Sequence, residues 1–126
     1  MNYLLVFVGA GIGGMLRHGA NLLGLRLAGE AFPLATLAVN IVGSFAMGLV
    51  AGVFMLKADL PHPLRLFLAT GILGGFTTFS AFSLDAVALY ERGEVGVAAL
   101  YIVASVALSI AGLWAGLSLI RALLAA

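Results

Sequence analysis

The sequence predicts an all-α membrane protein with four transmembrane helices. Of the 126 residues, 63% are hydrophobic and only 9% are charged, whereas a soluble domain usually has about 25% charged residues. A chain of this size could not bury so much apolar surface within itself. Most charges gather in short breaks between four long apolar segments. We therefore expect a single multi-pass domain over residues 1–126 in a cell membrane.

Each apolar segment exceeds the roughly 20 residues that a membrane helix needs. The predicted spans are residues 3–25, 32–56, 66–90 and 95–120. Four spans place both chain termini on the same side of the membrane. The formal net charge of +1 provides no basic face for a nucleic acid. The lack of cysteine excludes disulfides, thiolate metal sites and thiol catalysis.

Lysine and arginine in the loops, which normally set orientation, give almost no bias here. One side would hold Lys57, Arg65 and Arg121, and the other would hold Arg26 and Arg92. Two interpretations follow from this balance. Lipid and partner proteins fix one topology, or the chain inserts both ways and pairs with an inverted copy of itself.

The first span carries Gly9, Gly13 and Arg17 at four-residue spacing, on one helix face. Small residues at this spacing let helices approach closely, so we expect the glycines to serve packing. An arginine inside a span is costly and usually faces a cavity, water or backbone carbonyls. The alternative for Arg17 is that its side chain extends to the membrane interface.

The second span contains TLAVNIVGSFAMG, with Asn40 about a third of the way along. Ser44 and Thr36 lie one turn to either side, on the same face. An interhelical hydrogen bond is one use for such an asparagine. The other use is in a polar strip that faces a pathway, because an amide can hold an anion without carrying charge.

The third span contains GGFTTFSAF, residues 74–82, and here we expect a broken helix near residues 74–80. Each glycine weakens a helix by about 1 kcal/mol, and hydroxyl side chains compete for backbone hydrogen bonds. A break frees carbonyls for a cation such as Na⁺ and amides for an anion. Phe79 and Phe82 are three residues apart and point the same way. Their positive ring edges could attract a small anion, although ordinary packing is the alternative.

The fourth span carries Tyr101, Ser105 and Ser109 at four-residue steps. The three hydroxyls would form a ladder of about 12 Å along one helix face. Isolated serines in membrane helices usually bond to carbonyls of their own helix. Three hydroxyls in register also suit the lining of a polar pathway, and both interpretations stay open at this point.

Taken together, these four segments resemble the Fluc-type (CrcB-like) fluoride channels, which are small bacterial membrane proteins. The resemblance runs over nearly the whole chain and is most specific in GGFTTFSAF. It implies an antiparallel, dual-topology homodimer with two fluoride pathways and one central structural Na⁺. It also implies a non-enzymatic function, the passive export of fluoride from the cytoplasm, which lowers the concentration and toxicity of fluoride there.

The resemblance also implies roles for individual residues. Backbone carbonyls of Gly74 and Thr77 from both subunits would hold the Na⁺. The implied fluoride pathway comprises two rings, an asparagine, four hydroxyls and an arginine: Phe79, Phe82, Asn40, Ser80, Tyr101, Ser105, Ser109 and Arg17. Position 81 departs from the family pattern, because Ala81 stands where a threonine is usual. One hydroxyl of the polar path is therefore missing.

Two other functions fit part of the sequence. A small proton-coupled multidrug exporter also has four short spans, but it needs a carboxylate embedded in the membrane. The first, second and fourth spans contain none, and Asp85 lies towards the end of the third. An intramembrane enzyme would need a nucleophile with a base, or a metal site. His18 and His62 lie near span ends without such partners.

Overall fold

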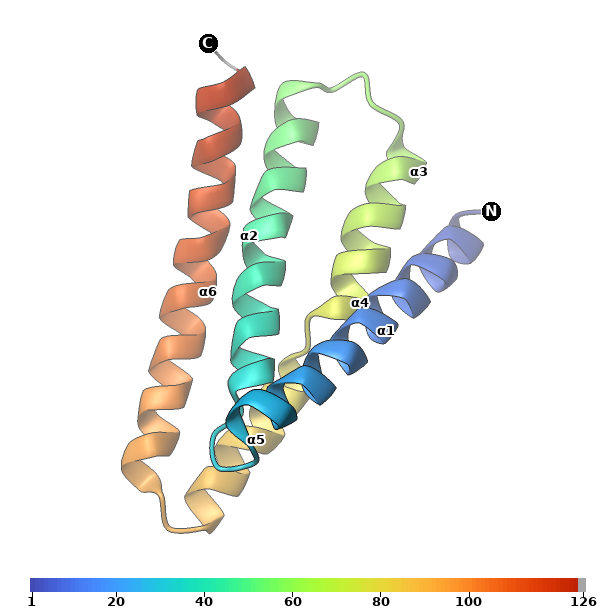
Figure 1. Cartoon of the computed structure of the whole chain (residues 1–126). Coiled ribbons are helices and arrows are strands. Elements are labelled where there is room, and N and C mark those ends of the chain that lie inside the picture. The colour runs from blue at the N-terminus through green and yellow to red at the C-terminus, as the bar shows by residue number, and fades with distance from the viewer. Residues whose placement is uncertain (125–126) are drawn as a thin grey trace.

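The structure, a computed structural model, describes residues 1–124, and these residues form helices joined by short turns (Figure 1). Helix α1 spans Asn2–Ala28, α2 spans Leu34–Leu56 and α6 spans Val95–Leu124. With the interrupted segment His62–Glu91, four helical segments in the described part are long and apolar enough to cross a membrane. The all-α prediction is confirmed. The predicted domain boundary at residue 126 lies outside the described residues.

The third span is composed of four consecutive helical pieces. It begins with α3 (His62–Arg65) and a π-helical stretch, η1 (Leu66–Leu73). A single turn, α4 (Gly74–Phe76), then leads to the break, and α5 (Phe79–Glu91) completes the span. The predicted interruption near residues 74–80 is thus confirmed.

The break consists of two extended residues, Thr77 and Thr78. Their φ and ψ angles are −84° and 158° for Thr77 and −152° and 119° for Thr78. Gly74 keeps helical angles, with φ −63° and ψ −37°. The hydroxyl of Thr78 accepts a hydrogen bond of 3.1 Å from the amide of Ala81 and so caps α5. The threonines therefore form the break, and the glycines before it remain in the helix.

Helices α2 and α6 lie side by side along most of their length (Figure 1). Two buried glycines bring their backbones together. A Cβ atom on Gly48 would overlap with the carbonyl of Leu113, and one on Gly116 would overlap with the carbonyl of Phe45. Small residues at a membrane-helix interface permit such close approach. This pair of helices forms the rigid wall on which the site is built.

Helix α1 crosses the other helices obliquely and packs against η1 and α4 (Figure 1). Gly9 and Gly13 are buried at this crossing, where added Cβ atoms would meet the backbone of the third span. Gly75 faces the backbone of Ala10 at the same crossing. Below the break, α5 packs against α6 instead. The third span therefore has different neighbours on the two sides of its break.

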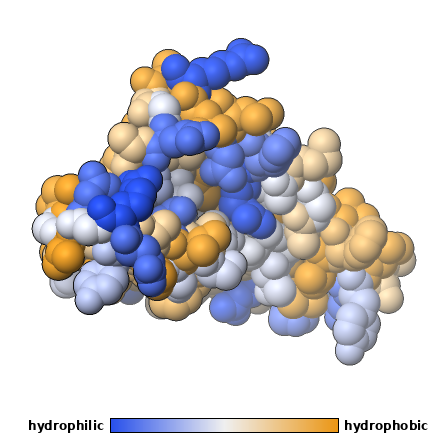
Figure 2. Space-filling view, turned by 90° about the horizontal axis from the view of Figure 1, so that it is seen from below, coloured by the Kyte–Doolittle hydropathy of each residue, from blue (hydrophilic) through white to orange (hydrophobic). Residues whose placement is uncertain are grey.

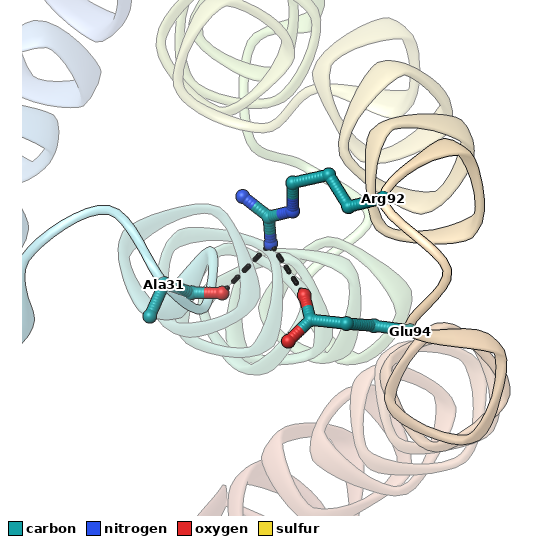
Figure 3. Close-up of polar contacts among 3 residues, drawn as sticks. All are labelled: Ala31, Arg92 and Glu94. Carbon is teal, nitrogen blue, oxygen red and sulfur yellow. Dashed lines mark hydrogen bonds and ion pairs between the residues drawn. The ribbon is translucent and has the colours of Figure 1, made fainter.

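The loop α1–α2 and the loop α5–α6 meet at the end of the molecule opposite the chain termini (Figure 1). One guanidinium nitrogen of Arg92, Nη2, donates hydrogen bonds of 2.9 Å to the carbonyl of Ala31 and to the carboxylate of Glu94 (Figure 3). Seen from this end, hydrophilic side chains gather over the loops and hydrophobic side chains flank them (Figure 2). The polar loop end and apolar flanks suit a membrane interface.

Candidate functional site

An open groove of about 380 Å³ lies between α2, α5 and α6, next to the break. Five residues of the predicted pathway line it: Asn40, Phe79, Phe82, Ser105 and Ser109. Thr77 and Thr78 of the break border the same groove, together with Gly43 and Ser44 of α2. The structure thus brings together side chains from three separate spans, which sequence spacing alone could not place relative to one another.

The hydroxyl of Ser105 is buried without a hydrogen-bond partner among the described residues. The Ser105 side chain is only 6% exposed. Burying an unpaired hydroxyl costs about 1–3 kcal/mol. The serine does not bond to a carbonyl of its own helix, which was the structural alternative. Ser105 therefore keeps an unused hydrogen-bond donor at the wall of the groove.

Aromatic rings form a continuous row beside the groove. The ring centres of Phe79 and Phe82 lie 5.4 Å apart, and those of Phe82 and Tyr101 are also 5.4 Å apart. Phe32 extends the row with an edge-to-face contact of 5.6 Å on Tyr101. Phe79 is 78% exposed at the other end of the row. Sequence analysis placed Phe32 at the start of the second span and gave it no role, whereas α2 begins at Leu34 and the Phe32 ring contacts Tyr101 from the preceding loop.

The predicted hydroxyl ladder divides at Tyr101. Ser105 and Ser109 line the groove, whereas the Tyr101 side chain is fully buried behind it. The Tyr101 hydroxyl donates a hydrogen bond of 3.1 Å to the carboxylate of Asp85. Sequence analysis noted Asp85 only for its place in the third span. The contact joins α5 to α6 and fixes the direction in which the tyrosine hydroxyl points.

The amide of Asn40 is bonded to the backbone of the break. Its Nδ2 atom donates to the carbonyl of Thr78 at 3.0 Å, and its Oδ1 atom accepts from the Thr78 amide at 2.8 Å. Asn40 thus lines the groove while both ends of its amide contact one residue of the third span. One Nδ2 hydrogen remains for a further contact.

The carbonyls of Gly74 and Thr77 have lost the donors that a continuous helix would supply. In a continuous α-helix, the Gly74 carbonyl would accept from the Thr78 amide and the Thr77 carbonyl would accept from the Ala81 amide. The Thr78 amide donates to Asn40 Oδ1, and the Ala81 amide donates to the hydroxyl of Thr78. Backbone carbonyls without donors are suitable ligands for a hard cation. Groups of three or more His, Asp or Glu side chains that could hold a metal are not found in residues 1–124.

The remaining residues of the predicted site lie outside the groove. Arg17 donates from Nε to the carbonyl of Gly75 at 3.1 Å and so links α1 to α4. Ser80 is exposed, and its hydroxyl lies 3.3 Å from that of Thr78. Ala81 lines a second pocket of about 320 Å³ together with Thr36 and Asp85. The hydroxyl missing at position 81 would therefore face this second pocket.

Comparisons with known proteins place these features in context. The family model described as "CrcB-like protein, Camphor Resistance (CrcB)" matches residues 4–117. A protein from Rhodopseudomonas palustris (strain BisB5), named fluoride-specific ion channel FluC, is 61% identical over 123 residues, which cover 98% of this chain and 99% of the relative. Proteins of the same name from Granulibacter bethesdensis and Methylobacterium nodulans are 59% identical over 124 residues and 58% identical over 121 residues. The alignments cover 98% of both chains in the first case, and 96% of this chain and 97% of the relative in the second.

Proposed function

Because the chain belongs to the CrcB-like family, we propose that it is a fluoride-selective ion channel that lets fluoride leave the cytoplasm passively. Hydrogen fluoride is a weak acid and crosses membranes while neutral. It releases its proton in a near-neutral cytoplasm, so the charged fluoride ion is trapped there. A cell with a negative interior can expel this anion through a selective pathway without another energy source. Export in this way lowers the toxicity of fluoride.

The observation that carries this proposal is the buried, unpartnered hydroxyl of Ser105 in the groove. Fluoride holds its water tightly, so a pathway must replace that water one contact at a time. Ser105 and Ser109 can donate hydrogen bonds, and the free Nδ2 hydrogen of Asn40 offers another. Neutral donors bind an anion without the strong attraction of a fixed positive charge, which would slow its release.

Phe79 and Phe82 supply a second kind of contact along the groove. Their rings line the same space as the serines and lie 5.4 Å apart. The positive edge of an aromatic ring attracts an anion. A small anion can thus pass from hydroxyl donors to ring edges with little change in free energy. The proposed pathway runs along this face of α5 and α6.

We also propose that the working channel is an antiparallel homodimer with dual-topology insertion. The groove is open on one side, and Phe79 at its rim is 78% exposed. A second copy would cover this ring and close the pathway. The near balance of loop charges, with Lys57, Arg65 and Arg121 against Arg26 and Arg92, favours insertion in both orientations.

A structural Na⁺ at the dimer interface is the proposed cofactor. The carbonyls of Gly74 and Thr77, which lack their helical donors, would hold it from both copies. Such an ion would neutralise the carbonyl dipoles of two facing breaks. The break would then have two roles. Its free carbonyls would bind the cation, and the side chains of Thr77 and Thr78 would line one edge of the anion groove.

The protein is a multi-pass membrane protein, and we place it in the plasma or inner membrane of a bacterium. The organisms of the relatives named above support this placement. The proton-coupled multidrug exporter is not supported, because those relatives are named fluoride channels. In addition, the Asp85 carboxylate accepts a hydrogen bond from the Tyr101 hydroxyl, so this carboxylate already has a partner inside the protein.

An efflux assay on purified protein in liposomes tests the proposed function. Vesicles loaded with potassium fluoride or potassium chloride are diluted into buffer free of the loaded anion, a potassium ionophore lets K⁺ leave with the anion so that charge balances, and anion release is followed with an ion-selective electrode. We expect rapid fluoride release, no chloride release and no requirement for a proton gradient. Strict proton-coupled movement of an organic cation, without fluoride release, would contradict the proposal.

A further inference from the structure

The paired hydrogen bonds between Asn40 and Thr78 resemble the contact between neighbouring β-strands. One side chain satisfies both the amide and the carbonyl of a single extended residue, at 2.8 and 3.0 Å. Only one orientation of the Asn40 amide allows both bonds, with Oδ1 towards the Thr78 amide. The contact joins α2 to the break across 38 positions in sequence.

The same contact prevents the third helix from closing. In a continuous helix the Thr78 amide would donate to the carbonyl of Gly74. Asn40 Oδ1 takes this donor instead. The Gly74 carbonyl is thus left without its helical partner.

We propose that Asn40 is a positioning residue that holds the break open at Thr78 and so keeps the Gly74 carbonyl free to bind the cation. The inference rests on the cation site of the proposed function and assigns to that site a residue that does not touch the ion. A role limited to binding the anion would need only the remaining Nδ2 hydrogen. Two bonds to one backbone residue fit a structural function in addition to it.

Hydrogen–deuterium exchange tests the contact itself. The Thr78 amide of the unchanged protein should exchange slowly, like a helical amide, although its backbone is extended. Asn40→Leu removes both partners. If the break then closes, the Thr78 amide donates to the Gly74 carbonyl and stays protected, so the readout in this variant is the set of backbone carbon chemical shifts of Thr77 and Thr78, which we expect to move from extended to helical values. A fast Thr78 amide in the unchanged protein, or extended chemical shifts at Thr77 and Thr78 in Asn40→Leu, would overturn the inference.

Thermal unfolding in sodium chloride and in N-methylglucamine chloride tests the link to the cation. The unchanged protein should unfold at a higher temperature in Na⁺, because a ligand of the folded state stabilises it. Asn40→Leu, which removes the acceptor for the Thr78 amide, should lose this Na⁺-dependent shift. Ser105→Ala is the matched control, because it changes the groove and leaves the break untouched. It should retain the shift while fluoride efflux falls.

The two measurements separate failure of the inference from failure of the proposed cation site. If Asn40→Leu keeps the full Na⁺ shift while efflux falls, Asn40 is an anion ligand only, and the inference is wrong. If the unchanged protein shows no Na⁺ shift, the cation site itself is wrong. The chemical shifts of Thr77 and Thr78 in Asn40→Leu then still decide whether Asn40 holds the break open.

Discussion

The hydroxyl of Tyr101 donates a hydrogen bond of 3.1 Å to the carboxylate of Asp85, and this bond joins α6 to α5 below the break. Phe82 and Phe32 contact the same tyrosine ring. A fully buried tyrosine with two ring neighbours and one hydrogen bond has little freedom to move. The contact therefore fixes the inner end of the aromatic row relative to the groove.

Tyr101→Phe should destabilise the protein by about 1–3 kcal/mol, because the Asp85 carboxylate loses its donor without a change in packing. The measurement is the free energy of unfolding in detergent. Tyr90→Phe is the control, because Tyr90 is 63% exposed on α5, and it should leave this free energy unchanged. Equal stability of Tyr101→Phe and the unchanged protein would show that the bond contributes nothing.

Replacing both rings, Phe79→Ile with Phe82→Ile, should abolish fluoride efflux while the protein still folds. Isoleucine keeps the apolar volume but lacks the positive ring edge. Efflux from liposomes measures the function, and size-exclusion chromatography with circular dichroism verifies the fold. Unchanged efflux would show that these rings serve packing alone.

Ser105→Ala should have opposite effects on stability and on function. The unpaired buried hydroxyl is destabilising, so its removal should stabilise the protein by up to about 1 kcal/mol. Efflux should fall, because the pathway loses a donor. Ser118→Ala, on an exposed part of α6, should change neither quantity. A destabilised Ser105→Ala variant with normal efflux would contradict both expectations.

Gly116→Ala should destabilise the protein by roughly 1–3 kcal/mol, because the new methyl group forces α6 away from the carbonyl of Phe45. Gly96→Ala is the control on the same helix, where a Cβ meets no atom within 4 Å. Thermal unfolding in detergent compares the two variants. Similar unfolding temperatures would show that α2 and α6 can separate at no cost.

Hydrophobicity and spacing were sufficient to predict the four spans and the broken third helix. The apolar segments have no other stable environment than a bilayer, and the packing glycines repeat at helical spacing. The position of the break was less well defined. Sequence analysis gave only the range 74–80, with the glycines and the hydroxyl residues as joint causes, whereas the structure places the break at Thr77 and Thr78. Packing of Gly75 against Ala10 explains why this glycine remains in the helix.

Contacts between spans were beyond the reach of spacing arguments. Asn40 and Thr78 lie 38 positions apart, and Arg17 and Gly75 lie 58 apart. Their pairing depends on how the helices cross, which helical periodicity does not specify. Phe32 escaped prediction for a similar reason, because its ring contacts Tyr101 from a loop. The resemblance indicated which residue types matter, and the structure shows which backbone groups they contact.

The interruption at Thr77 and Thr78 also determines how the third span can be shared. Above it, η1 and α4 pack against α1, and below it, α5 packs against α6. An uninterrupted helix has a single axis and could pack along only one of these neighbours. The two extended residues change the direction of the third span, so that its first part packs against α1 and its second part packs against α6. Strengthening the helix at Thr77 and Thr78 would therefore remove the proposed cation site and also weaken the packing of the third span against either α1 or α6.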